Sequence, residues 1–564
     1  MDKKFLFLGI SSLFLAAILM LGEAKKNTVQ VAGPQQVPAV TQEQQPRHRP
    51  AKTPRHGQRR HNDPPLLLQN DFIRVEISPT GGGIRSIAML KYAANRDSSA
   101  PWIFDDYDSV QDALTAQLLV DRNYVPLSSV QFHVAESTQH HLLLRGRLSD
   151  GKTVERSYEL SPSDGAGDPY DLRQRISVVG SGIDAIELSL GSLPATNGDV
   201  GDNLKFVSYD GKRAHFTPMR SFSSSGGFFG IGRREGRDSI NWRQAMTWAA
   251  IKNHFFAAIL TPSRPAIAAE CAPIDIGTIS AGGLGGSVTI PLTADGDRSI
   301  VDFSYYVGPL EYVRLDRLGG GRERVMEFGI FGFLGKLLLF ALLGVHAIVP
   351  NWGWAIVLLT VAVKLLLWPL VTAQVRSSQK MASIQKPLKD IQRRYKLNPK
   401  KSQEETLKLF RENGVNPAAG CLPLILQIPI FFGLYSMLRS ASELRFAKFL
   451  WVKDLSVADT VAKLGPIPLN LLPLFMGITM FMQMRSTPMP TQSQGQRWML
   501  SAMPLICTAL CYNFPAGLVL YWTVQNSIGI VQQTLIQRKM RLQAAAVPAN
   551  QPKKPLKQVR TKLR

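Results

Sequence analysis

One cation lies inside a long apolar run of this sequence. Residues 352–371 are almost entirely apolar, but Lys364 lies within them. A charge at the depth of a bilayer costs at least ~2.5–3.5 kcal/mol on insertion scales, so such a residue usually faces a bundle interior or a watery cavity. The competing interpretation is a lysine that snorkels to an interface, which the long apolar stretches on both sides of Lys364 disfavour. Lys364 is therefore the first candidate functional residue.

Neutral polar side chains occur in the same apolar segments, and none of these segments contains an Asp or Glu that could relay protons or bind a cation. Polar groups in lipid need partners or water, so a shared wet cavity would explain them. Hydrogen bonds between helices, worth ~0.6 kcal/mol a pair, explain the Gln and Asn residues equally well. The candidates beside Lys364 are Thr360, Gln427, Tyr435, Tyr521, Thr523, Gln525 and Asn526.

One string matches a nucleotide-binding motif, because residues 146–153 fit the phosphate-loop pattern. That loop holds phosphate only between a strand and a helix. Here residues 153–158 alternate like a strand, and Asp150-Gly151 is a hairpin turn signal. The sequence thus favours a β-hairpin, and it contains no catalytic constellation. We expect no enzyme, cofactor or metal site.

The charge distribution orients the apolar segments. Residues 376–418 contain 11 basic and 4 acidic side chains, and residues 538–564 contain 9 basic and no acidic ones. Short loops rich in Lys and Arg stay cytoplasmic. Lys3 and Lys4 place the N-terminus in the cytoplasm as well, so the number of crossings between it and residue 376 must be even. Residues 5–21 and 352–371 supply two, which makes residues 328–349 a helix that lies in the external interface. We expect spans near residues 5–22, 351–374, 421–438, 468–484, 498–512 and 516–536.

The composition of the sequence before residue 350 changes twice. Residues 5–21 form either an uncleaved anchor, which we favour, or a signal peptide cleaved after the small-x-small sequence at residues 22–24. The segment to residue 65 is rich in Pro, Gln and basic residues, and this composition predicts a disordered tether. From residue 66, short alternating runs and Gly/Pro turns predict a large antiparallel β-sandwich.

Residues 376–414 read as two basic helices. Pro387 interrupts the first, and Ser402 with Glu405 forms a capping box that opens the second. Asn398-Pro399 is the expected turn, and Gly414 is a candidate helix end. A cytoplasmic helical hairpin follows from this pattern.

Two long strings resemble the signatures of the YidC-type membrane protein insertases of Gram-negative bacteria. They are NPAAGCLPLILQIPIFFGLY at residues 416–435 and FPAGLVLYW at residues 514–522, and WAAIKNHFF at residues 248–256 adds a match in the external region. The resemblance covers nearly the whole chain. It implies a polytopic α-helical membrane protein, with an N-terminal anchor helix, a five-helix insertase core and a large external β-supersandwich domain.

The resemblance also implies a hydrophilic groove that opens to the cytoplasm and to lipid. In most relatives its cation is an Arg five residues before a Pro, and here Lys364 stands five residues before Pro369. A lysine keeps the charge but lacks the forked guanidinium. Trp522, in the second string, joins the candidate groove residues.

The implied function is that of an insertase and folding chaperone for nascent inner-membrane proteins, acting alone or with the Sec translocon. Partners would be the bilayer and, through the basic hairpin and tail, the ribosome. The implied location is the inner membrane, with both termini cytoplasmic and the large domain periplasmic. The alternative is a small-solute or anion transporter that uses Lys364 as its binding cation, although the internal repeats typical of transporters are missing. The expected domains are 1–22 (anchor), 23–65 (linker), 66–320 (β domain), 321–350 (interfacial helix), 351–540 (core, with the hairpin 376–414) and 541–564 (basic tail).

Overall fold

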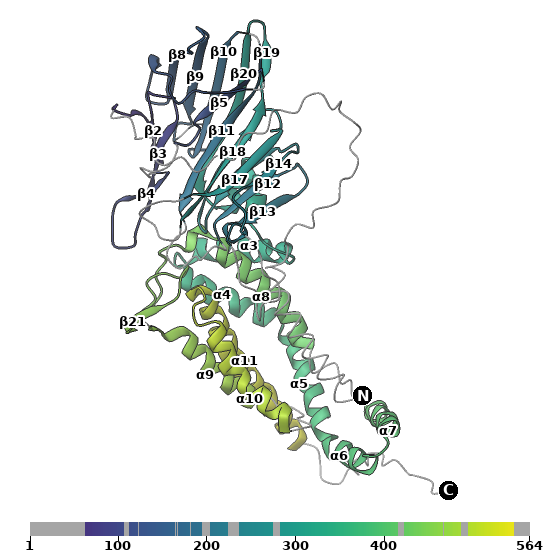
Figure 1. Cartoon of the computed structure of the whole chain (residues 1–564). Helices are drawn as coiled ribbons and strands as arrows, with labels where there is room; N and C mark the ends of the chain where they lie inside the picture. Colours follow the sequence, from purple (N-terminus) through teal and green to yellow (C-terminus); the bar gives the residue numbers. More distant parts are fainter. Residues whose placement is uncertain are drawn as a thin grey trace. The chain divides into compact units, whose positions relative to one another are not determined.

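The computed structural model describes most of the chain after residue 62. The described residues are 63–105, 112–121, 123–163, 165, 167–180, 182–194, 203–223, 236–274, 282–414, 422–465, 467–486 and 494–545. The expected anchor, nearly all of the linker, most of the basic tail and residues 416–421 of the first signature string lie outside them. The chain forms two compact units, with the main boundary between Glu327 and Phe328 (Figure 1).

The first unit is an antiparallel β domain of three sheets. The four-stranded sheet has the order β1 (Leu66–Gln69), β2 (Ile73–Ile77), β3 (Ile84–Ala93) and β4 (Pro101–Phe104). The six-stranded sheet has the order β14 (Ile240–Trp242), β17 (Ala268–Ile274), β18 (Gly283–Pro291), β11 (Ile183–Pro194), β5 (Ala116–Val120) and β6 (Asn123–Pro126). The ten-stranded sheet has the order β13 (Ala214–Pro218), β12 (Lys205–Tyr209), β15 (Trp248–Lys252), β16 (Phe256–Pro262), β20 (Arg298–Pro309), β10 (Asp171–Val179), β9 (Thr153–Leu160), β8 (His141–Arg147) and β7 (Phe132–Ser137), with β19 (Thr293–Asp295) beside β20.

The two larger sheets face each other, because β11 and β18 of one pack on β15, β16 and β12 of the other (Figure 1). Alternation in the sequence produces this core, as in β2, where Ile73, Val75 and Ile77 are buried and the residues between them are partly exposed. The predicted antiparallel sandwich is confirmed. The short helices of this unit are η1 (Met219–Ser221), α2 (Tyr312–Arg317) and η3 (Arg322–Val325).

The string that fits a phosphate loop is a β-hairpin. Strands β8 and β9 pair antiparallel, with Arg147 opposite Thr153. Gly151 has φ 86°, a left-handed conformation that glycine adopts without steric cost. No helix follows the loop, so it lacks the aligned N–H groups that hold phosphate.

A buried arginine of the ten-stranded sheet hydrogen-bonds to loops beside the four-stranded and the six-stranded sheet. Arg156 on β9 is fully buried, and its two terminal nitrogens donate to the carbonyl oxygens of Gly81 (2.7 Å) and Leu114 (2.9 Å). The neighbouring Tyr158 hydroxyl donates to the carbonyl oxygen of Gly82. Burial disfavours the charged form and lowers the pKa of Arg156 from its usual value. These bonds satisfy loop carbonyls that would otherwise be buried without donors.

The second unit is mainly helical. Its described elements include a small hairpin of β21 (Thr460–Leu464) and β22 (Ile467–Asn470), preceded by the short helix η5 (Ser442–Leu444). Its helices are α3 (Gly332–Ile348), α4 (Trp352–Leu366), α5 (Trp368–Ser383), α6 (Gln385–Arg394), α7 (Pro399–Glu412), α8 (Leu422–Ser440), α9 (Leu471–Ser486), α10 (Gln494–Leu510) and α11 (Ala516–Ala545). The helix α11 packs against α9 and α4.

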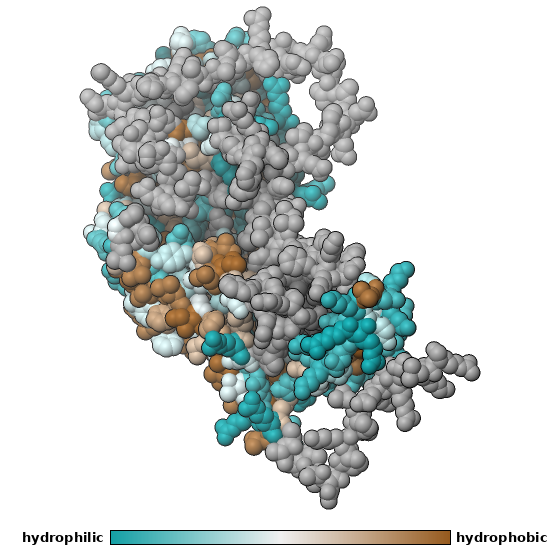
Figure 2. Space-filling view, turned by 60° about the horizontal axis from the view of Figure 1, so that its bottom comes forward, coloured by the Kyte–Doolittle hydropathy of each residue, from teal (hydrophilic) through white to brown (hydrophobic). Residues whose placement is uncertain are grey.

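Large apolar side chains are exposed on several of these helices, including α3 and α9. Such patches mark surfaces that contact lipid or a partner. On α3 the exposed residues are spaced by four, three and eight positions, which places them on one helix face. Figure 2 shows hydrophobic surface on this unit beside the mainly hydrophilic surface of α6 and α7. The exposed residues are Phe333, Leu337, Phe340 and Ile348 on α3 and Leu474, Phe475, Ile478, Phe481 and Met482 on α9.

The expected span at 351–374 is a broken helix. The helix α4 ends at Leu366, and α5 begins at Trp368 after a bend of 59°. Pro369 lies in the first turn of α5 and explains the break, because proline lacks an N–H and its ring clashes with the carbonyl four residues earlier. Within the described residues no single helix has both the length and the hydropathy of a membrane span, whereas α4 and α5 reach them only as this bent pair.

Two details of the predicted basic hairpin are wrong. The helix interruption lies at Ile384, between α5 and α6, and Pro387 is tolerated in the first turn of α6, where its missing N–H has no partner to lose. The second helix begins at Pro399 rather than at Ser402. Asn398 caps it, since its side chain accepts a hydrogen bond from the backbone N–H of Lys401 at 3.2 Å.

The amides of α6 and α7 should exchange faster than those of α8 and α11. These two helices pack mainly on each other, through a few buried side chains such as Leu388 and Leu409, and therefore open at low free energy. Hydrogen–deuterium exchange of the full chain in lipid nanodiscs measures this difference. Protection of α6 and α7 equal to that of α11 would contradict the expectation and indicate a rigidly held hairpin.

Candidate functional site

Three of the candidate polar residues form one hydrogen-bonded cluster. The side-chain amide nitrogen of Gln427 on α8 donates to the Tyr521 hydroxyl and to the Gln525 side-chain oxygen, each at 3.1 Å. Tyr521 and Gln525 lie four residues apart on α11 and therefore on one face of that helix. Both are buried. We call Gln427, Tyr521 and Gln525 the amide–phenol cluster.

Two further candidates meet around Phe431, one turn along α8 from Gln427. The Phe431 ring stacks on Tyr435, with ring centroids 6.3 Å apart, and contacts Trp522 edge-on at 5.0 Å. Tyr435 also lies against Phe514, at 5.8 Å between centroids. Five of the candidates on α8 and α11 thus form two neighbouring groups, a polar one (Gln427, Tyr521 and Gln525) and an aromatic one (Tyr435 and Trp522).

Lys364 is partly buried in the last turn of α4, three residues before the break at Leu367. Its ammonium makes no ion pair or hydrogen bond with any residue that the structure describes. Thr360, one turn earlier, is buried, but its hydroxyl donates to the carbonyl oxygen of Ile356 on the same helix at 2.6 Å. Lys364 is thus a cation near a helix break without a protein counter-ion among the described residues.

Asn526 does not join the amide–phenol cluster. It follows Gln525 directly and so points from a different face of α11. Its side-chain nitrogen lies 3.4 Å from the Thr479 hydroxyl and 3.5 Å from the Met476 carbonyl oxygen, both on α9. The Thr523 hydroxyl likewise donates to the carbonyl oxygen of Val519 on its own helix. The Asn526 contacts are those expected of polar groups that hold helices together, whereas the Thr523 bond stays within α11.

The structure adds a polar residue that the sequence reasoning missed. Gln532 on α11 is fully buried, and neither polar atom of its side chain has a hydrogen-bond partner among the described residues. It lies seven residues, or about two helical turns, beyond Gln525 and so on the same face. The spacing of Tyr521, Gln525 and Gln532 in the sequence could have predicted that they share one helix face. A polar stripe therefore extends along α11.

The arrangement offers hydrogen-bond donors, acceptors and one cation, but no reacting groups. Within the described residues no group of three or more His, Cys, Asp or Glu side chains could hold a metal ion. Such a site can hydrate or bind a passing polar segment and attract an anionic one.

Two family models match the chain. One, described as the YidC periplasmic domain, matches residues 66–341, and the other, described as 60Kd inner membrane protein, matches residues 344–544. Together they define an inner-membrane protein with a periplasmic domain.

Individual relatives agree with this class. The membrane protein insertase YidC of Haemophilus influenzae is 30% identical over 84% of this chain and 86% of its own length. The YidC insertase of Endomicrobium trichonymphae is 42% identical, over 43% of this chain and 47% of its own length. A crystal structure of an active YidC insertase with its first transmembrane domain resolved aligns over 85% of this chain and 94% of that one, at 18% identity and a TM-score of 0.35.

The chain belongs to the YidC family of membrane protein insertases. This is a family of insertases and not of enzymes, which agrees with the sequence analysis. Family membership gives no support to the alternative of a small-solute or anion transporter.

Proposed function

We propose that this chain inserts hydrophobic segments of nascent inner-membrane proteins into the bilayer by way of a hydrophilic groove. The proposed groove is lined by Lys364 and the amide–phenol cluster. The observation that supports this proposal most directly is the state of Lys364. It is partly buried, has no counter-ion among the described residues and lies next to the bend between α4 and α5, in a chain of the insertase family. A cation in that state attracts the acidic residues of an incoming segment.

The driving force in this mechanism is the transfer of apolar side chains into lipid, which needs no nucleotide. Water around the amide–phenol cluster and Gln532 would shorten the apolar barrier for the polar tail of the segment. The aromatic side chains of Tyr435 and Trp522 would line the path along α8 and α11. The remaining candidates, Thr360 and Asn526, belong to the proposed groove as supporting residues. Asn526 holds α11 against α9, and Thr360 lies one turn before Lys364 with its hydroxyl bonded within α4.

The proposed topology places the helices α4–α5, α8, α9, α10 and α11 across the membrane, as a five-helix core after the N-terminal anchor. Both termini and the α6–α7 hairpin then lie in the cytoplasm, since short basic loops stay on that side. The proposed domain boundaries remain those at 22, 65, 320, 350 and 540. The exposed apolar face of α3 suits the membrane interface.

We further propose two assisting partners. The basic hairpin and tail suit contact with ribosomal RNA, because clustered Lys and Arg bind phosphates electrostatically. The Sec translocon is the proposed partner for more complex substrates, on the strength of the family resemblance alone. A chain reconstituted without either partner isolates the core activity.

To test this function, the purified chain is reconstituted in liposomes and a short single-span protein is added. We expect the added protein to acquire a protease-protected fragment only in liposomes that contain this chain. Empty liposomes and liposomes with an unrelated polytopic protein are the controls. Equal protection in all three preparations would refute the proposed function.

A further inference from the structure

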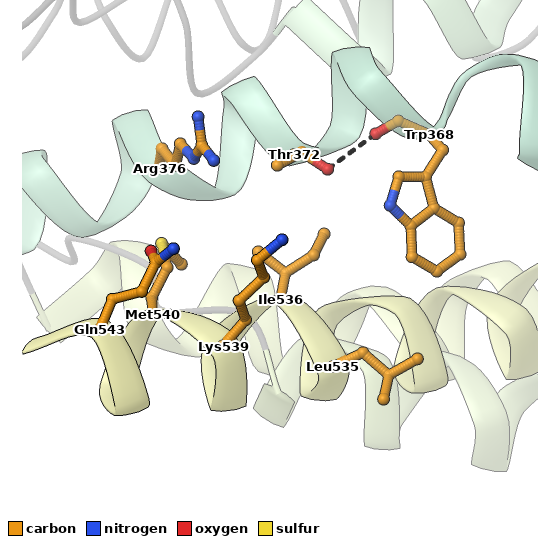
Figure 3. A pocket seen from close by; sticks show the side chains of 8 residues that line it. All are labelled: Trp368, Thr372, Arg376, Leu535, Ile536, Lys539, Met540 and Gln543. Atoms are coloured by element: carbon orange, nitrogen blue, oxygen red, sulfur yellow. Dashed lines mark hydrogen bonds between the residues drawn. The ribbon is translucent and has the colours of Figure 1, made fainter. Parts of the chain in front are cut away.

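A cavity of about 210 Å³ lies between α5 and α11, beyond the amide–phenol cluster. Figure 3 shows its eight lining side chains, with the Lys539 amino group and the Trp368 indole in the space between the two helices. The cavity is lined by Trp368, Thr372 and Arg376 from α5 and by Leu535, Ile536, Lys539, Met540 and Gln543 from α11.

The polar side of this cavity is cationic. Arg376 and Lys539 come from different helices, and neither makes an ion pair with a described residue. None of the eight lining side chains is acidic. Gln543 adds an amide, and Trp368 adds an indole N–H that can only donate. Two cations with further donors on facing helices match the oxygen atoms of a phosphate, to which the Arg fork can bind bidentately.

The other side of the cavity is apolar. Leu535, Ile536 and Met540 supply the apolar lining from α11. The Trp368 ring lies at the end of Leu535 and Ile536, and Met540 lies at the other end, beside Gln543 (Figure 3). The Thr372 hydroxyl donates to the Trp368 carbonyl oxygen at 2.9 Å and is thereby occupied within its own helix. A free phosphate ion gains nothing from contact with such an apolar wall. An acyl chain or glycerol backbone attached to the phosphate does, since burying it removes apolar surface from water.

We propose that this cavity binds the phosphodiester headgroup of one anionic phospholipid, with Arg376 and Lys539 on the phosphate and the α11 wall against the first part of an acyl chain. Basic pockets between helices at the cytoplasmic face of a membrane are suited to such lipids. The inference rests on the proposed topology, which brings the ends of α5 and α11 to that face. A bound lipid there would bridge α5 and α11 just beyond the bend.

Native mass spectrometry of the full chain in detergent tests the inference with phosphatidylglycerol and phosphatidylcholine as probes. We expect one phosphatidylglycerol to bind at least tenfold more tightly than phosphatidylcholine. The double variant Arg376→Gln/Lys539→Gln should lose this preference. Leu535→Gln should weaken the lipid but leave soluble glycerophosphoglycerol, the free headgroup, unaffected.

The matched control is Lys380→Gln/Arg538→Gln, which removes the same charge from exposed positions on the same two helices but outside the cavity. This control should keep the preference. An equal loss in both double variants would overturn the proposal in favour of unspecific surface charge. Displacement of the lipid by equimolar glycerophosphoglycerol would instead reveal a phosphate-ion site. Displacement by an acidic peptide would reveal a site for substrate tails, and either result refutes a lipid site.

The charge-keeping variant Arg376→Lys/Lys539→Arg separates the inference from misfolding, because it should retain the lipid. The outcome is also independent of the proposed function. A chain that binds phosphatidylglycerol as expected but fails to insert a substrate in liposomes refutes the function alone. A chain that inserts substrates without any preference for anionic lipid refutes the lipid site alone.

Discussion

Replacing Lys364 by Ala or Glu should lower the insertion of substrates with acidic external tails by about tenfold or more. That loss is about 1.4 kcal/mol, well within the ~4 kcal/mol attraction of two opposite charges 4 Å apart near a protein surface. Lys364→Arg should keep most of the activity, since the charge persists. The insertion of substrates with neutral tails should fall less, because the transfer of apolar side chains into lipid supplies most of the driving force.

The measurement is protease protection of paired substrates that differ only in tail charge, normalised to the amount of each variant in the membrane. Thr360→Ser is a suitable control on the same helix, because it keeps the hydroxyl that bonds to Ile356. Equal defects on acidic and neutral substrates would remove the electrostatic role of Lys364. Loss of protein in all three Lys364 variants would mark it as a structural lysine.

Replacing Arg156 by Met should destabilise the β domain by about 2–6 kcal/mol. The variant leaves the carbonyl oxygens of Gly81 and Leu114 buried without their donors, and each such group costs about 1–3 kcal/mol. Hydrogen exchange of the β9 and β10 amides in the full chain reports the opening free energy of this region.

Arg145→Met provides the control for this effect. Arg145 lies on the adjacent strand β8 and pairs with Glu155 at 2.8 Å, but its side chain is 58% exposed. Exposed pairs contribute about 0–1 kcal/mol, so this variant should be nearly neutral. Similar destabilisation by both substitutions would show that Arg156 acts through general strand packing and not through the two loop carbonyls.

Local sequence patterns were sufficient to predict the β domain. The alternation of Ile73, Val75 and Ile77 already defines the buried face of β2, because side chains on a strand alternate by geometry. The turn signal at Asp150-Gly151 was likewise more reliable than the phosphate-loop pattern, because it depends on local conformation. Gly151 adopts a positive φ, and the Asp150 carboxylate accepts a hydrogen bond from the backbone N–H of Lys152. The order of the strands in the two large sheets could not be predicted, because it depends on pairings between residues far apart in the chain.

The helical unit was predicted less completely. Its apolar segments are visible in composition, and the pairing of Gln427 with Tyr521 and Gln525 was foreseen only as a shared polar environment. The break near Pro369 was missed because a proline in an apolar run either kinks a helix or opens a new one, and packing decides between them. The same ambiguity misplaced the interruption at Pro387. Gln532 was missed although its spacing from Gln525 gives the shared helix face, because the spacing does not show that this face is buried.

The break at Leu367 also determines how freely this chain can change in length. Within a continuous helix one added residue turns everything beyond it by about 100°. Because α4 ends before Leu367 and α5 starts anew at Trp368, a residue added at the break itself can be absorbed there without turning Lys364 or Arg376 on its own helix. A residue added within α5 would instead rotate Arg376 relative to α11. Length variation among related chains should therefore collect at the break, with α4 and α5 each kept constant.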